Sequence, residues 1–387
     1  MITIKDKSEC TGCGACENIC LAGAIMVEYN DEGFLYPVID QNKCNNCERC
    51  KTVCHKRESY MINNTSTPEC FAGYLKDTEE LSNVSSGGVF WALTQTILNQ
   101  NEGIVVGVVH PSIFDVHHES ARTLEDAKKF KRSKYLQSNT RKIYTEVKDA
   151  LKNSETVLFS GTPCQIAGLY AFLGKEYEKL ITCEVVCHGV PTMYGFKQYI
   201  KSLEEKYKSK VCEIVYRDKR NGWSNNHISI AFENGEELCE RSAKNLFHSA
   251  YLAGLYSMPS CGRCRYAMLP RIADITLADY WKYEGTMKVG NKNRGISLII
   301  CSTYKGINLL DKAKKYLILE KSDLNAAVAS CRHLTNSPRE NSKRELFFTL
   351  INKNGYDYSV KKCMRQTVRK KLVNLLWRLK KIKKNRG

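Results

Sequence analysis

Two stretches near the N-terminus, CTGCGACENIC at residues 10–20 and CNNCERCKTVC at residues 44–54, decide the architecture of the first part of the chain. Each stretch carries four cysteines with the spacing C-x2-C-x2-C-x3-C, so the second run repeats the first. Three cysteines at intervals of three residues in a tight loop can surround three corners of a cube, while the fourth points away from it. Gly12 and Gly14 suit such a loop, because glycine adopts backbone angles that other residues avoid. The spacing therefore predicts a pair of related thiolate sites within residues 1–60.

This run resembles the one with which bacterial ferredoxins hold two 4Fe–4S clusters, where the fourth cysteine of each run ligates the other cluster. The resemblance assigns a first cluster site to Cys10, Cys13, Cys16 and Cys54. It assigns a second cluster site to Cys44, Cys47, Cys50 and Cys20. Leu21 and His55 stand where the ferredoxins usually have proline, a departure in turn geometry and not in ligand number. Structural zinc is the alternative, but zinc sites usually use separated C-x2-C pairs.

Length and composition limit the class of protein. A chain of 387 residues with 43% hydrophobic residues predicts two or three globular domains. Nineteen cysteines would suit a secreted disulfide scaffold, but MITIKDKSEC at the N-terminus has no apolar signal segment. Cluster thiolates also require a reducing compartment. We therefore expect a cytoplasmic protein.

The net charge of +18 is concentrated at the C-terminus. Residues 361–387 contain twelve Lys or Arg and no Asp or Glu, so the rest of the chain is only mildly basic. Global charge therefore gives no reason to expect a nucleic-acid partner. Apolar residues recur at helical spacing in this tail, which is the profile of a helix at a membrane surface. Attraction to anionic lipid would be worth ~1 kcal/mol per basic residue. A solvated tail is the equal alternative, and the first interpretation would place the protein peripherally at the inner membrane.

The remaining sequence predicts a linker and one larger domain. Residues 61–69 are polar with a proline and are interpreted as a linker. Over residues 70–360, short β-rich runs alternate with helical stretches, which favours an α/β domain with parallel pairing. The expected fold class is α+β and α/β, a small ferredoxin-like module followed by a mixed α/β domain, with a basic helix at 361–387. Strands are expected at 104–109, 156–160, 180–186 and 295–303, helices at 88–99 and 141–152, and a strand–turn–strand at 210–240 around Asn234-Gly235.

Four cysteines of the larger domain predict a third metal site. Cys164 and Cys187 each follow a predicted strand, and strand ends are where α/β folds place ligands. Cys261 and Cys264 form a C-x2-C pair in a loop, which suits a cluster or zinc equally. We expect most other cysteines to be small buried hydrophobes: Cys70, Cys183, Cys212, Cys239, Cys301, Cys331 and Cys363.

Three polar features have both a functional and a structural interpretation. Ser85, Ser86, Gly87 and Gly88 precede a helical stretch and suit a phosphate, but from the residues alone a plain serine helix cap is the favoured interpretation. His188 follows Cys187 and suits a catalytic proton donor or a structural hydrogen-bonding residue. The charged run at 217–220 is either a solvated turn or a clamp for an anionic substrate.

Seven motifs of the larger domain resemble the beta subunits of deazaflavin coenzyme F420 hydrogenases and dehydrogenases. They are SSGGVF (85–90), SKYLQS (133–138), GTPCQIAGL (161–169), CHGVP (187–191), RDKRNGW (217–223), CGRCRY (261–266) and ADITLADYW (273–281). The resemblance implies a mixed α/β flavin and iron–sulfur domain. Ala278 stands before Asp279 where the family motif usually has glycine.

The resemblance also implies cofactors and residues that hold them. A third 4Fe–4S cluster would be ligated by Cys164, Cys187, Cys261 and Cys264. FAD would be held by residues matching the family motifs: Ser85, Ser86, Gly87, Gly88, Ser133, Lys134, Tyr135, Gln137, Ser138, Thr162 and Gln165. His188 remains the candidate catalytic residue beside the third cluster.

The expected activity is that of an iron–sulfur flavoprotein oxidoreductase. Electrons would pass between the ferredoxin-type clusters and FAD, to reduce or oxidise a small-molecule substrate or a deazaflavin-like carrier. A ferredoxin or another redox partner would exchange electrons with the clusters, and association with similar bacterial proteins suggests surface-polysaccharide biosynthesis. The alternatives are an electron-transfer adaptor without its own substrate site, and a zinc-stabilised nucleic-acid binder.

Overall fold

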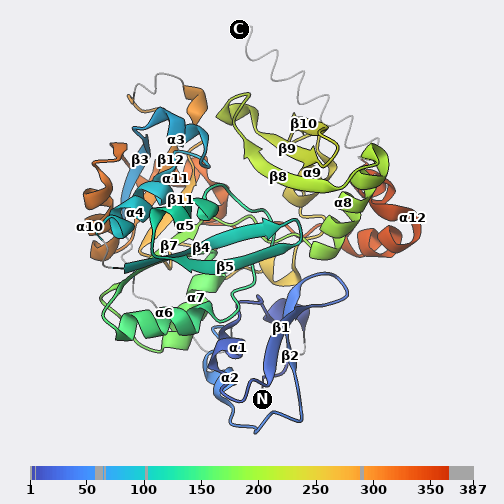
Figure 1. The fold of residues 1–387 in the computed structure, drawn as a ribbon, viewed down its shortest axis with the longest axis horizontal. Coiled ribbons are helices and arrows are strands. Elements are labelled where there is room, and N and C mark those ends of the chain that lie inside the picture. Colours follow the sequence, from blue (N-terminus) through green and yellow to red (C-terminus); the bar gives the residue numbers. More distant parts are fainter. Residues whose placement is uncertain are drawn as a thin grey trace.

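The computed structural model describes residues 2–4, 6–56, 64, 67–100, 103–287 and 292–365. Its described strands form a two-stranded, a three-stranded and an eight-stranded sheet. Figure 1 shows the N-terminal module below the large sheet, with the three-stranded sheet to one side. The mixed α/β fold class predicted from sequence is confirmed.

The N-terminal module repeats its backbone as well as its cysteines. Its elements are the 3-10 helix η1 (Lys7–Glu9), α1 (Ala15–Ile19), the antiparallel pair β1 (Ile25–Tyr29) and β2 (Leu35–Ile39), and α2 (Arg49–Thr52). Gly12 and Gly14 have φ of 64° and 79°, and the equivalent Asn46 and Glu48 have φ of 55° and 62°. The same left-handed turns therefore precede both short helices, so each cysteine run wraps in the same way.

The large sheet has the order β13-β3-β12-β11-β7-β6-β4-β5. Strands β4, β6, β7 and β11 pair in parallel, and the other pairings are antiparallel. The strands are β3 (Glu69–Leu75), β4 (Gly103–Ser112), β5 (Asp115–Ala121), β6 (Thr156–Gly161), β7 (Leu180–Val185), β11 (Ile275–Asp279), β12 (Ser297–Cys301) and β13 (Leu317–Ser322).

Helices cover both faces of this sheet because its central strands are apolar on both sides. Val105 of β4 packs into the core that also contains Trp91 of α4 (Val89–Leu98) and Leu309 of α10 (Tyr304–Ala313). Its neighbours Ile104 and Val106 pack into a second core with α6 (Ile143–Lys152) and α7 (Pro163–Leu173). Shorter helices complete the layers: α3 (Thr78–Ser82), α5 (Leu124–Ala127), η2 (Lys128–Phe130), η5 (Lys292–Arg294), α11 (Leu324–Ser330) and η6 (Arg332–Leu334).

A third core lies under the smaller antiparallel sheet. This sheet consists of β8 (Val211–Asp218), β9 (His227–Phe232) and β10 (Glu237–Arg241). Aromatic side chains pack it against α8 (Met193–Tyr207), α9 (Leu246–Leu252) and α12 (Arg344–Met364). The 3-10 helices η3 (Trp223–Asn225) and η4 (Pro259–Cys261) lie in its connections.

Most of the elements expected from sequence are confirmed. The strands at 104–109, 156–160 and 180–186 are β4, β6 and β7, and residues 295–303 contain β12. The turn at Asn234-Gly235 joins β9 to β10, with φ of 86° at Gly235. The strand–turn–strand prediction for 210–240 was incomplete, because β8 adds a third strand.

The predicted domain boundaries remain predictions. Residues 361–364 continue α12, and the predicted tail from residue 366 onward lies outside the described residues. Most of the predicted linker at 61–69 lies outside them as well. Among the helices of the described chain, none is long and apolar enough to cross a bilayer.

Buried His118 makes the stability of the large sheet depend on pH. Its ring stacks on Phe159 at 5.6 Å, and its Nε2 lies 3.1 Å from the Ser160 carbonyl oxygen. Burial lowers the pKa of His118 from 6.5 to about 4. Below pH 6.5 the unfolded chain therefore binds a proton at this histidine, whereas the folded chain does not bind it until about pH 4. The contribution of neutral His118 to the unfolding free energy is fully present above pH 6.5 and is lost as the pH falls towards 4.

We expect anaerobic denaturant unfolding to show a loss on the order of 2 kcal/mol from this group between pH 7.5 and pH 5. His118→Gln does not titrate in this range, so its unfolding free energy should fall less steeply. An equal slope for both proteins would contradict the assignment.

Candidate metal centres

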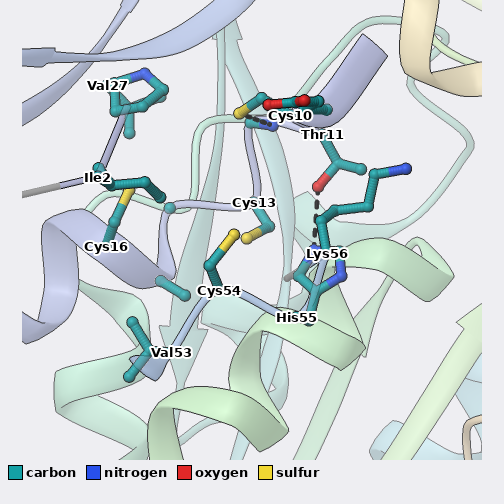
Figure 2. Close-up of a pocket in the computed structure, with 15 residues that line it drawn as sticks. Ile2, Cys10, Thr11, Cys13, Cys16, Val27, Val53, Cys54, His55 and Lys56 are labelled. Carbon is teal, nitrogen blue, oxygen red and sulfur yellow. Dashed lines mark hydrogen bonds between the residues drawn. The ribbon is translucent and has the colours of Figure 1, made fainter. Parts of the chain in front are cut away.

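The four cysteines of the first cluster site line one cavity. A cavity of about 380 Å³, counted with its open mouth, is bounded by Cys10, Cys13, Cys16 and Cys54. Figure 2 shows the Cys13 and Cys54 side chains pointing toward each other, with His55 and Lys56 beside them. The two cysteine runs therefore meet as the ferredoxin resemblance implies, with the fourth cysteine of the second run joining the first three.

The surroundings of these thiols suit a cluster ligated by thiolates. The backbone N–H of Gly12 donates to Cys10 Sγ at 3.3 Å, and such bonds to sulfur tune iron–sulfur clusters. Burial raises the pKa of Cys10 to about 11 and also raises the pKa values of Cys13 and Cys16. Neutral thiols are thus favoured until a metal supplies the charge that deprotonates them. The residues therefore fit the group that the spacing implies.

The cysteines predicted for the second cluster site differ in their exposure. Cys50 is buried and accepts a hydrogen bond from Ile2 N at 3.2 Å, and Cys20 accepts one from Ala24 N at 3.3 Å. Cys44 is half-buried and Cys47 is exposed. A group held here would therefore be closer to solvent than one held at the first site.

The third four-cysteine site is also gathered around one cavity. A cavity of about 710 Å³, counted with its open mouth, is lined by Cys164, Cys187, Cys261 and Cys264. Cys164 is the second residue of α7, which directly follows β6, and Cys187 follows β7. Because β6 and β7 are parallel neighbours, their carboxyl ends meet at one edge of the sheet. The other two thiols come from Cys261, the last residue of η4, and Cys264 in the turn that follows it.

The thiols of the third site accept hydrogen bonds and have raised pKa values, as those of the first site do. Thr162 Oγ1 lies 3.2 Å from Cys164 Sγ, and Gly189 N donates to Cys187 Sγ at 3.3 Å. Burial raises the pKa of Cys164 to about 11 and that of Cys187 to about 12. Cys183, which the sequence predicted to be a small buried hydrophobe, is buried inside β7 among apolar residues of the sheet core. The structure thus brings together the four cysteines chosen from sequence.

The first and third sites share a wall. Thr11 and Lys56 line both cavities. On the far side of the loop, a side chain added at Gly168 of α7 would lie 2.9 Å from Cys13 Sγ. The hydroxyl of Tyr144 donates to the Cys13 carbonyl at 2.8 Å. The module therefore docks on the large domain through the loop that holds its first cluster site.

The cysteines that line these cavities are too far apart to hold a single metal ion. Over the described ranges, no three or more His, Cys, Asp or Glu side chains gather closely enough to hold one metal ion. All nineteen cysteines are free thiols. The ligands of a cubane cluster stand around a cube rather than around a point, so the cavity lined by four thiols is the relevant geometry.

The predicted flavin residues separate into two groups. Gln137, Ser138, Thr162 and Gln165 line the cavity of the third site. Gln165 Nε2 donates to Ser138 Oγ at 3.0 Å, and its Oε1 accepts from Thr162 N at 2.9 Å. Gln137 also reaches the module, where its Oε1 accepts from Leu35 N at 3.0 Å.

The second group lies near the start of α4. Ser133 N and Oγ lie 2.8 and 2.9 Å from Ser85 Oγ, and Lys134 Nζ donates to the carbonyls of Lys129 and Lys131. Tyr135 points elsewhere, into an aromatic cluster with Tyr216, His248 and Tyr251.

The serine cap expected for α4 is wrong. The N-cap is Gly88, with φ of 75° and no side-chain cap. Gly87 packs so tightly that a Cβ would lie 2.2 Å from the Gly73 carbonyl oxygen. Ser86 Oγ instead donates to the Ile296 carbonyl at 3.0 Å. The two glycines are required by close packing on β3 and β12, and the serines bind neighbouring segments.

The charged run at 217–220 is not a solvated turn. The Arg217 side chain is 7% exposed and donates to Asp279 at 2.7 Å, where Trp223 Nε1 also donates at 2.9 Å. Lys219 Nζ donates to the carbonyls of Leu81 and Ser86 at 2.8 and 2.6 Å. Of the four residues, Arg220 is the most exposed and pairs with Glu237. These contacts join the small sheet to the large one.

His188 lies beside the third site and makes a structural contact. Its Nε2 lies 3.1 Å from the Leu252 carbonyl oxygen, and its ring meets that of His333 at 4.3 Å. Burial lowers the pKa of His188. Its catalytic role remains a prediction.

Several residues that shape these sites were missed from sequence. Tyr144, Gly168 and Tyr266 belong to the walls between the module and the large domain. Arg271 and Glu184 form a fully buried ion pair near Cys187. Gly168 and Tyr266 lie inside the motifs GTPCQIAGL and CGRCRY, and His55 replaces the proline usual after a fourth cluster cysteine. Tyr144, Glu184 and Arg271 carried no such signal.

Two family models match separate parts of the chain. Residues 9–57 match the 4Fe-4S dicluster domain, and residues 154–327 match the family described as the C terminus of the coenzyme F420 hydrogenase/dehydrogenase beta subunit. These ranges contain all twelve cysteines of the three sites. The resemblance stated from the motifs is therefore confirmed, while SSGGVF and SKYLQS lie outside the matched residues.

Comparison of the fold gives a distant similarity. A chain of the F420-reducing [NiFe] hydrogenase complex from Methanosarcina barkeri, studied by xenon derivatization, aligns with a TM-score of 0.46 and 17% identity. The alignment covers 71% of this chain and 92% of that one. No curated protein sequence gives a significant match.

Proposed function

We propose that this chain, in which a 4Fe–4S dicluster domain precedes a region of the coenzyme F420 hydrogenase/dehydrogenase beta-subunit family, is an oxidoreductase that carries electrons from three iron–sulfur sites to a flavin. The observation that supports this most is the shared wall. Thr11 and Lys56 line both the first and the third cavity, so the ferredoxin-type module faces the four-cysteine site of the large domain.

The chain's own residues would hold three clusters in sequence. The outer cluster would be held by Cys44, Cys47, Cys50 and Cys20. The middle cluster would be held by Cys10, Cys13, Cys16 and Cys54, which line one cavity. The inner cluster would be held by Cys164, Cys187, Cys261 and Cys264, which line another. Bound clusters supply one-electron chemistry. At the two inner sites, backbone N–H groups donate to sulfur, from Gly12 to Cys10 and from Gly189 to Cys187.

We also propose that FAD binds beside the inner cysteines. Gln137, Ser138, Thr162 and Gln165 present amide and hydroxyl groups to the cavity that the inner cysteines line. A flavin bound there would pair single electrons for a small-molecule substrate or deazaflavin-like carrier. The exposed Cys47 end suits exchange with a one-electron carrier such as a ferredoxin.

An anaerobic reductive titration tests this function. Three clusters accept about three electrons per chain and FAD accepts about two more, so uptake of about five electrons is expected, with flavin released by acid. Uptake of about three with no flavin would reject the flavin and support the electron-transfer adaptor. Uptake of two or fewer would reject the three-site proposal.

A further inference from the structure

His55 occupies the wall between the first and third sites. Its side chain is 3% exposed, and Cys54, the last ligand of the first site, precedes it. The ring Nε2 lies 3.1 Å from Thr11 Oγ1, and Nδ1 forms a short hydrogen bond with the Tyr266 hydroxyl. A neutral imidazole offers one donor and one acceptor, so both of its nitrogens are used.

Both partners of His55 lie next to cluster ligands. Thr11 follows Cys10 of the first site, and Tyr266 is two residues after Cys264 of the third site. Tyr266 lines the third cavity, while His55 lines the first. A single imidazole therefore connects the two loops that carry ligands of different sites.

Two further contacts hold this arrangement in place. Arg265 Nη1 donates to the His55 carbonyl at 2.8 Å, so the backbone is fixed as well as the ring. The rings of His55 and Tyr266 lie 5.5 Å apart between centroids and are tilted by 51°. Proline at this position, as in the ferredoxins, would have neither ring nitrogen to offer.

We infer that His55 is a positioning residue that, through Tyr266, fixes the first cluster site against the third and thereby sets the rate of electron exchange between them. This inference rests on the proposed function. In the exchange one electron leaves one site and arrives at the other, so one is oxidised as the other is reduced. No covalent bond forms or breaks. The side chains only fix the distance between the two cluster sites and their relative orientation.

Tyr266→Phe is the decisive variant, because it removes one hydroxyl and keeps the ring. His55→Pro restores the ferredoxin residue and removes both side-chain bonds, while His55→Gln retains a donor and an acceptor. Tyr280→Phe is the matched control, since it removes a buried hydroxyl bonded to Ser322 at 2.7 Å, away from the sites.

Two measurements are made on the anaerobic full chain. Electron paramagnetic resonance of the fully reduced protein reports the magnetic interaction between neighbouring sites, which depends on their separation and orientation. Pulse radiolysis with methyl viologen injects one electron and follows its internal redistribution. We expect Tyr266→Phe and His55→Pro to weaken the interaction and slow redistribution about tenfold, the lower range for losing an outer-shell partner. His55→Gln should recover most of the rate, and Tyr280→Phe should match wild type.

An unchanged interaction and rate in Tyr266→Phe would overturn the inference, as would an equal slowing in Tyr280→Phe. These failures are distinct from failure of the proposed function, in which the wild-type protein itself would lack the third cluster.

Discussion

Replacing Cys261 and Cys264 together by serine is expected to lower bound iron from about twelve to about eight atoms per chain, because one of three four-iron clusters loses half its ligands. Both thiols line the third cavity with Cys164 and Cys187. The remaining eight irons belong to the module, whose ligands are all within residues 10–54. Electron uptake should fall by about one, and transfer beyond the module should stop.

The matched control replaces Cys212 and Cys239 by serine. These two thiols lie on β8 and β10, outside the three sites, so iron content and electron uptake should stay at wild-type values. A wild-type chain that binds only about eight iron atoms, with the same iron content in the Cys261/Cys264 variant, would contradict a cluster at the third site.

Arg271→Met is expected to lower the unfolding free energy by about 3–5 kcal/mol, the cost of leaving a buried charge without its partner. Arg271 Nε donates to Glu184 Oε1 at 2.5 Å, and both side chains are 1% exposed or less. Arg271 also donates to the carbonyls of Tyr266 and Leu334 through Nη1. Anaerobic urea unfolding followed by circular dichroism measures the effect.

Two comparisons isolate the buried charge as the cause. Arg271→Met combined with Glu184→Gln removes the unpaired carboxylate and should recover part of the loss. Arg122→Met breaks the exposed Arg122–Glu155 pair and should cost about 0–1 kcal/mol. Equal losses for Arg271→Met and Arg122→Met would contradict the account.

The local features were predictable from sequence because local rules produce them. The cysteine spacing gave both loops of the module, and the same positive φ angles recur at Gly12 and Asn46. Cys164 and Cys187 were placed correctly because parallel strands β6 and β7 end at one edge. The predicted strands, together with the cysteines that follow them, were sufficient to predict that these two thiols lie close to each other.

The contacts between the module and the large domain were not predictable, because they join positions far apart in the chain. His55 and Tyr266 are separated by 211 residues, and neither has a neighbour that identifies the other. SKYLQS was interpreted as a flavin segment, yet Gln137 also binds Leu35 of the module and Tyr135 joins an aromatic cluster. Ser85 and Ser86 were plausible N-caps for α4. The N-cap is instead Gly88, and Gly87 before it packs closely against β3.

The iron and acid-labile sulfide content of the anaerobically purified wild-type chain, measured with its reduced paramagnetic resonance spectrum, tests the central claim most directly. We expect about twelve irons and twelve sulfides per chain, with a spectrum in which three clusters interact magnetically. About eight of each, with the spectrum of an isolated two-cluster ferredoxin, would contradict it.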